Sequence, residues 1–111
     1  MILRLLDQAE NDLVEGVRFY EAQQPGLGSY FLDNLYGDIE SLYLYAGIHR
    51  KVWKRYHRLL SKRFPFAVFY TMTDDAVFVH AVLDCRRNPV WVRNQLKNRQ
   101  QASRRAAQGL G

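Results

Sequence analysis

Two adjacent apolar segments, residues 66–73 and 76–83, constrain the fold of this chain more than any other feature. Both are rich in β-branched and aromatic residues, and only Asp74 and Asp75 separate them. A short acidic break between two such segments predicts a β-hairpin. In the first strand the alternating residues of both faces are apolar, so we expect the hairpin to be central in a sheet and covered on two sides.

The chain upstream of this hairpin has the periodicity of two helices. Apolar residues recur at helical spacing over residues 9–20, and Asp7 stands at the position of a capping residue before them. Residues 25–28, Pro-Gly-Leu-Gly, interrupt the pattern. A second apolar stripe over residues 31–46 follows Ser29, a residue suited to cap a second helix. Two antiparallel helices joined by a short turn form an αα-hairpin.

Shorter segments complete the predicted order of elements. Residues 2–6 and 57–60 predict strands, and Asn88-Pro89 predicts the start of a short C-terminal helix that includes Leu96. The expected fold class is α+β: a small antiparallel sheet packed on an N-terminal αα-hairpin, in the order β-α-α-β-β-β plus a C-terminal helix. The helical hairpin can cover only one face of the sheet. The sequence leaves open whether the C-terminal segment or a partner chain covers the other face.

The length of 111 residues predicts a single domain, which we place at residues 1–98, followed by a basic, flexible tail at 99–111. No apolar run approaches the roughly 18 residues of a membrane span, so we expect no membrane association. A single cysteine, Cys85, gives no disulfide framework and predicts a reducing cytoplasm. The three histidines and this cysteine lack metal-site spacing, so we expect no metal and no cofactor.

Charge is distributed unequally along the chain. Residues 1–49 carry a net charge of −6 and residues 50–111 carry +11, which together give the overall +5. A basic half beside an acidic half predicts a polyanionic partner or an acidic protein partner.

Much of the positive charge lies in one short stretch, which we call the basic patch. It contains seven basic residues and no acidic residue, interleaved with Trp53, Tyr56 and His57. Arginine forks and aromatic faces together are typical of sites that bind phosphates and unstacked bases. The alternative is a solvated edge strand whose charges prevent aggregation. The residues of the basic patch are Arg50, Lys51, Lys54, Arg55, Arg58, Lys62 and Arg63.

In their order and spacing, four motifs resemble the RelE/ParE superfamily of bacterial toxins, and the ParE-like branch most closely. They are Phe-Tyr-Glu at residues 19–21, the Pro-Gly-Leu-Gly turn at 25–28, Lys-Arg-Phe-Pro-Phe-Ala-Val-Phe-Tyr at 62–70, and Val-Leu-Asp-Cys-Arg-Arg-Asn-Pro at 82–89. The resemblance covers residues 3–96. It implies the toxin of a type II toxin–antitoxin, plasmid-stabilisation-like module, held in a hetero-oligomer by a cognate antitoxin.

The stretch after the last strand distinguishes the branches of this superfamily. In the RelE-like ribonuclease branch an arginine here holds the scissile phosphate, and Arg86 or Arg87 matches that position. That branch usually supplies a tyrosine or histidine shortly afterwards, whereas residues 88–91 of this chain read Asn-Pro-Val-Trp. Loss of a general acid or base typically costs about 10²–10⁴-fold in rate. The sequence therefore favours the ParE-like branch, whose members inhibit DNA gyrase by binding.

Three functional hypotheses follow from the resemblance. In the first, the chain binds gyrase without chemistry of its own, through Arg86, Arg87, Arg93 and Lys97. In the second, it is a RelE-type, ribosome-dependent mRNA endoribonuclease, for which the catalytic candidates are His57, Arg63 and Arg86. In the third, it is a degenerate toxin or a nucleic-acid-binding module without activity. The remaining strand histidine, His80, is expected in the core or against another subunit rather than in catalysis.

Overall fold

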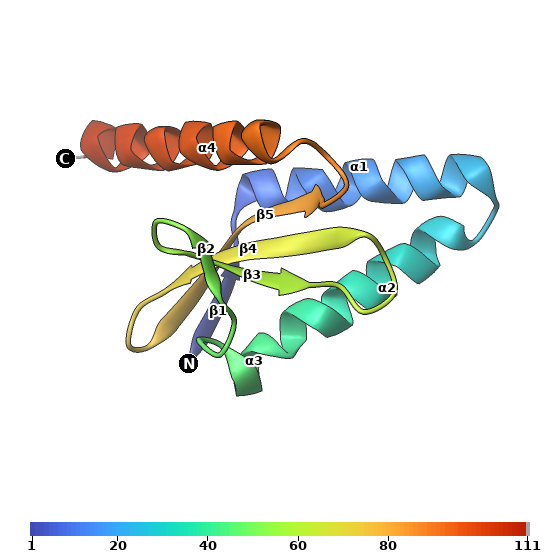
Figure 1. The fold of residues 1–111 in the computed structure, drawn as a ribbon, viewed down its shortest axis with the longest axis horizontal. Helices are drawn as coiled ribbons and strands as arrows, with labels where there is room; N and C mark the ends of the chain where they lie inside the picture. Colours follow the sequence, from blue (N-terminus) through green and yellow to red (C-terminus); the bar gives the residue numbers. More distant parts are fainter. Residues whose placement is uncertain (111) are drawn as a thin grey trace.

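The computed structural model describes the backbone of residues 1–110 and the side chains of residues 1–99. The elements are β1 (Ile2–Leu5), α1 (Asp7–Gln23), α2 (Leu27–Glu40), α3 (Leu42–Tyr45), β2 (Lys51–Trp53), β3 (Tyr56–Leu60), β4 (Phe66–Met72), β5 (Ala76–Asp84) and α4 (Pro89–Leu110) (Figure 1). The α+β class and the expected order are confirmed, with the one-turn helix α3 and the short strand β2 as additions.

The five strands form one sheet in the order β1-β5-β4-β3-β2. β1 pairs with β5 in parallel, and the other neighbours are antiparallel. The predicted hairpin is formed by β4 and β5, and its turn is closed by the amide of Thr73 donating to the carbonyl of Ala76 at 2.8 Å. The register shifts next to Tyr70, which pairs with Val79 while Phe69 pairs with Ala81. His80 is therefore the extra residue of a β-bulge.

Both faces of the sheet are covered, as the apolar alternation of the hairpin predicted. On one face, Val68 and Tyr70 pack with Phe31 and Leu35 of α2 in the larger core. On the other face, a smaller core forms around Leu96 of α4, which is only 1% exposed. The C-terminal helix therefore covers the second face, which decides between the two possibilities that the sequence left open (Figure 1).

The start of α2 differs from the sequence prediction. Gly26, in the left-handed conformation with φ 89°, is the N-cap, and Ser29 lies within the first turn of the helix. The carboxylate of Glu21 in α1 accepts hydrogen bonds from the amides of Gly26 at 3.0 Å and Gly28 at 2.9 Å. The prediction of Ser29 as N-cap was wrong because a side chain of the preceding helix binds amides that a local cap normally binds. Asp7 is likewise the first residue of α1 and not its cap.

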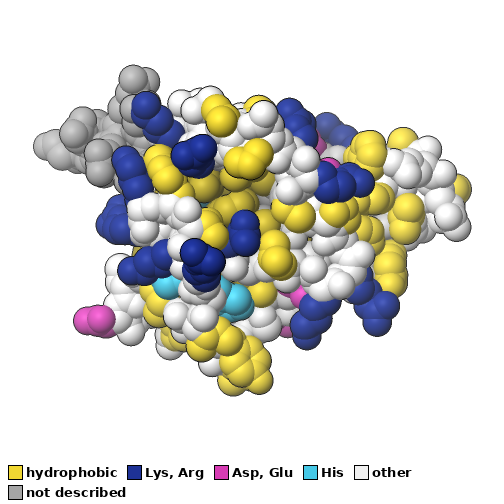
Figure 2. Space-filling model, viewed as in Figure 1, with side chains coloured by type: hydrophobic (Ala, Val, Ile, Leu, Met, Phe, Trp, Pro, Cys, Tyr) yellow, Lys and Arg dark blue, Asp and Glu magenta, His cyan; other side chains and the backbone are white. Residues whose placement is uncertain are grey.

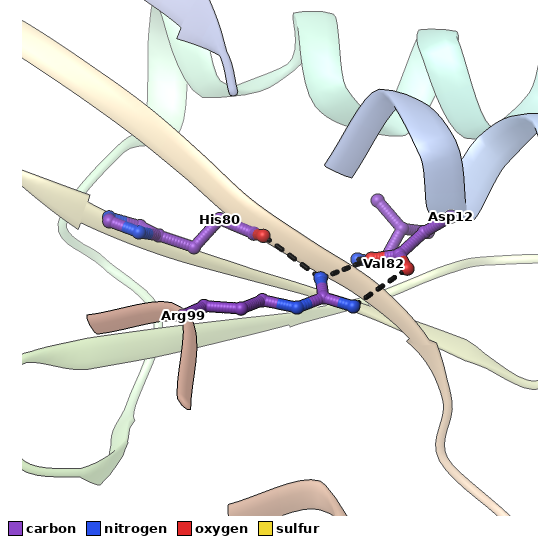
Figure 3. A network of polar contacts seen from close by, with 4 residues as sticks. All are labelled: Asp12, His80, Val82 and Arg99. Carbon is purple, nitrogen blue, oxygen red and sulfur yellow. Dashed lines mark hydrogen bonds and ion pairs between the residues drawn. The ribbon is translucent and has the colours of Figure 1, made fainter. Parts of the chain in front are cut away.

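The helix α4 is held to the domain by a buried ion pair between its residue Arg99 and Asp12 of α1 (Figure 3). Arg99 Nη2 donates to Asp12 Oδ1 at 2.8 Å, and Arg99 Nη1 donates to the carbonyl of His80 at 3.0 Å. Asp12 Oδ2 also accepts from the amide of Val82 at 2.9 Å. Both charged side chains are 11% exposed.

The length of the C-terminal helix also differs from the sequence prediction. The helix α4 is much longer than the short helix expected, and the ion pair fixes Arg99, the first residue of the predicted tail. The structure does not describe the side chains beyond Arg99, so the flexibility of residues 99–111 stays a prediction. Within residues 1–110, no helix combines the length and the apolar character needed to cross a membrane.

Replacing Asp12 with alanine is expected to destabilise the fold by about 3 kcal/mol, because it leaves a buried guanidinium and the amide of Val82 without their acceptor. Urea unfolding measures the change. Glu15→Ala, an exposed position on the same helix, is the matched control and should change little. The double variant Asp12→Ala with Arg99→Ala tests whether the two residues are coupled. If its loss of unfolding free energy equalled the sum of the losses in the two single variants, they would not be coupled and the expectation would fail.

Two glycines provide a second test of helix packing. A Cβ atom at Gly16 in α1 would lie 2.5 Å from the ring of the fully buried Phe31, whereas a Cβ at Gly37 in α2 would meet nothing within 4 Å. We expect Gly16→Ala to lower the free energy of unfolding by about 1–3 kcal/mol. Gly37→Ala should instead raise it by about 1 kcal/mol, since alanine is the better helix former. Thermal unfolding measures both variants. If the two substitutions changed the stability in the same direction, the close approach of α1 and α2 would be contradicted.

Candidate functional site

A hollow that we call the arginine pocket lies between α4 and the hairpin of β2 and β3. Its volume is about 250 Å³. Figure 2 shows the corresponding face of the molecule, where lysine and arginine side chains flank apolar side chains between α4 and the strands. The lining residues are Val52, Trp53, Arg58, Phe69, Cys85, Arg87, Pro89, Val92, Arg93 and Leu96.

Three arginines from three different elements meet in this pocket. Arg58 comes from β3, Arg87 from the segment after β5, and Arg93 from α4, and all three are exposed. The described lining residues include no carboxylate, so the positive charge is not neutralised within the pocket. The floor is apolar, since Phe69 is 4% and Leu96 is 1% exposed. The arrangement suits an anionic ligand that also carries an apolar group.

Aromatic side chains at this end of the molecule already have partners on their faces. Trp53 stacks on Tyr56 with 5.9 Å between ring centroids and an interplanar angle of 3°. The ammonium of Lys54 lies 4.8 Å from the centroid of Trp53, and the guanidinium of Arg87 lies 4.0 Å from the centroid of Trp91. These cation–π contacts orient the basic side chains. They also occupy ring faces that an incoming base would need.

Arg86 and Arg87 are neighbours in sequence but have different surroundings. Arg86 forms a two-point ion pair with Asp84: Nε donates to Oδ1 at 3.0 Å and Nη2 donates to Oδ2 at 2.6 Å. The Arg86 hydrogen bond lowers the pKa of the Asp84 carboxyl, which in turn raises the pKa of Arg86. Arg87 also helps to lower the pKa of the Asp84 carboxyl, but among the described side chains it forms no ion pair, and it lines the pocket. The acidic residue two positions before Arg86 is the sequence signal for this difference.

The other predicted basic residues are only partly brought together. All seven residues of the basic patch are exposed. Of these seven, the described lining of the arginine pocket includes only Arg58. Of the predicted target-binding residues, Arg87 and Arg93 line it, whereas Arg86 and Lys97 do not.

His57, the best catalytic candidate from the sequence, is a buried side chain with 7% exposure. Its Nδ1 lies 2.8 Å from the carbonyl of His49, and its ring stacks on Tyr70 at 4.9 Å with an interplanar angle of 14°. Tyr70 belongs to the core under α1 and α2, the sheet face opposite to α4. Burial lowers the pKa of His49 and raises that of Tyr70. The three candidates His57, Arg63 and Arg86 are all absent from the described lining of the pocket.

His80 lies at the bulge of β5, on the side of Tyr56. Its Nε2 is 2.8 Å from Thr71 Oγ1, and its ring meets Tyr56 edge-on at 5.1 Å. Burial, with smaller contributions from Arg55 and Arg99, lowers the pKa of His80 to about 4. The side chain is therefore neutral at pH 7, and it supports the strand pair within the fold. This agrees with the expectation that His80 is a packing residue.

A larger groove of about 570 Å³ lies between α1 and α4 and has a different character. Its lining combines amides with the carboxylates of Asp12, Glu15 and Asp84, and Arg87 also borders it. Asp12 and Asp84 are already paired with arginines. No group of three possible metal ligands comes together among the residues with described side chains.

The comparisons with known proteins place this geometry among solved folds. Neither a protein-family model nor a curated protein matches the sequence. Among solved structures, a chain of the chromosomal ParDE TA (toxin–antitoxin) system from P. aeruginosa is similar with a TM-score of 0.68 and 15% sequence identity. The match covers 74% of this chain and 92% of that chain. The chain therefore shares its fold with a chain of that toxin–antitoxin system, in agreement with the resemblance that its sequence motifs carry.

Proposed function

We propose that this chain is the toxin of a type II toxin–antitoxin module, which arrests growth by binding DNA gyrase. A cognate antitoxin neutralises it in a hetero-oligomer in the cytoplasm. The fold shared with a chain of a ParDE toxin–antitoxin system supports the module. The observation that carries the mode of action is a positively charged pocket without a histidine, tyrosine or carboxylate in its described lining.

The chemistry around the arginine pocket favours binding over catalysis. RNA cleavage by the 2′-hydroxyl needs a positioned base and acid whose pKa values lie near the working pH. The described lining includes no histidine, tyrosine or carboxylate. Tyr56 and His80 lie on this face of the sheet, but Tyr56 is 2% exposed, with a pKa raised by burial, and His80 is bonded to Thr71. Neither has the exposure or the pKa that proton transfer to a substrate requires.

The first experiment is pulse-labelling of DNA and protein synthesis in a bacterial host, just after this chain is induced without an antitoxin. We expect DNA synthesis to stop first, because inhibition of gyrase blocks replication before translation. If protein synthesis stopped first and transcripts were cleaved, the RelE-type endoribonuclease would replace this proposal. Unchanged growth at full expression of folded chain would instead indicate a degenerate toxin or a binding module without activity.

Charge reversal tests which surface acts on the target. The double variant Arg86→Glu with Arg87→Glu is expected to abolish growth arrest while circular dichroism shows an unchanged fold. Repulsion from an acidic target should cost at least about 2 kcal/mol of binding free energy, roughly thirtyfold in Kd. Arg87→Glu alone should account for most of the loss, since Arg86 is already paired with Asp84.

The matched control for this variant is Arg4→Glu with Arg18→Glu, two exposed arginines in the acidic half of the chain. The control should arrest growth as the unmodified chain does. A fully toxic Arg86→Glu, Arg87→Glu variant would remove this surface from the proposal.

A further inference from the structure

We infer that the arginine pocket recognises a segment of the target protein in which an acidic side chain lies beside an apolar one. This inference rests on the proposed function and specifies which chemical feature of the target this surface binds. It assigns Arg58, Arg87 and Arg93 to the carboxylate and the apolar floor to the neighbouring side chain.

The size and the floor of the pocket fit a side chain. Its volume of about 250 Å³ is below the roughly 300–1,000 Å³ that is usual for small-molecule sites. The floor is formed by Phe69, Val92 and Leu96, and Phe69 and Leu96 are almost fully buried. Val52 and Pro89 at its edge are exposed, so a leucine or phenylalanine placed there would remove apolar surface from water, which is favourable.

The rim supplies what a carboxylate requires. A guanidinium fork binds a carboxylate through two parallel hydrogen bonds, and this geometry is selective as well as strong. The three arginines come from β3, the segment after β5 and α4, and the guanidinium of Arg87 lies over the ring of Trp91 beside the pocket. The described lining includes no carboxylate, so no residue of the pocket neutralises the charge of these arginines. Arg86, in contrast, is paired with Asp84.

The same residues argue against a nucleic-acid strand as the occupant. Binding of single strands depends on open aromatic faces for base stacking. Trp53 is covered by Tyr56 and Lys54, while Phe69 is only 4% exposed. The described lining also has no hydroxyl or amide side chain that would bind a base edge or a 2′-hydroxyl. The pocket therefore offers positive charge and apolar contact to a ligand. A protein segment with an acidic and an apolar side chain can use both.

Fluorescence anisotropy of labelled probes with the full-length chain tests this inference. The main probe is a short peptide that alternates glutamate and leucine. The comparison probes are a glutamine–leucine peptide, a glutamate–serine peptide and an oligothymidylate of equal charge. We expect the glutamate–leucine peptide to bind most tightly, and Arg87→Gln with Arg93→Gln to weaken it by at least about tenfold, as expected for lost charge-assisted hydrogen bonds.

The control variant is Arg4→Gln with Arg18→Gln, which removes the same charge outside the pocket and should bind the peptide unchanged. The inference is overturned if the glutamate–leucine peptide does not bind, or if the glutamine–leucine peptide binds equally well. It is also overturned if the oligothymidylate binds more tightly and loses its affinity with the same substitutions, since the pocket would then be a nucleic-acid site.

Growth arrest measured in parallel separates this inference from the proposed function. If Arg87→Gln with Arg93→Gln loses the peptide but still arrests growth, the pocket does not recognise the target, and the toxin assignment stands. If the unmodified chain binds the peptide but does not arrest growth, the proposed function is wrong, and with it the assignment of the segment to a toxin target. Loss of both peptide binding and arrest in this variant, with both retained in the control, is the expected result.

Discussion

The ion pair between Asp12 and Arg99 holds together the parts of this structure that are furthest apart in the chain. Asp12 belongs to the first helix and Arg99 to the last, and β5 lies between them, bound to the pair through the backbone of His80 and Val82. A buried charge pair is favourable only when its remaining hydrogen-bonding positions are satisfied. Here β5 provides the amide of Val82 and the carbonyl of His80 that satisfy them, so the pair fixes α4 on the sheet.

The position of α4 in turn creates the arginine pocket. Arg93 and Leu96 are carried by this helix, and they face a floor and wall formed by Phe69, Arg58 and Trp53 from the sheet. A helix docked elsewhere would leave an apolar sheet face and scattered surface charges. The ion pair lies outside the described lining of the pocket, yet the arrangement of the three arginines depends on it.

Much of the fold was predictable because local patterns report which face of an element is buried. The apolar alternation over residues 66–73 predicted a hairpin covered on two sides, and both cores are present. The start of α2 was mispredicted because Glu21 reaches it from α1. The strand β2 was missed because three residues of an exposed, basic edge carry almost no periodicity. The C-terminal helix was predicted too short because its polar second half has no apolar stripe. Nothing in that sequence indicated that Arg99 pairs with Asp12.

The α+β class, the helical hairpin, the central strands and the separation of acidic and basic halves can all be read along the chain. These depend on residue types at short spacing, which neighbouring positions already specify. The packing of the elements, in contrast, brings Arg87 beside Arg58 and Arg93 and pairs Arg86 with Asp84. It also buries His57 on the opposite face of the sheet. The physical reason is that a side chain's partners depend on how separate elements pack, which residue spacing along the chain does not encode.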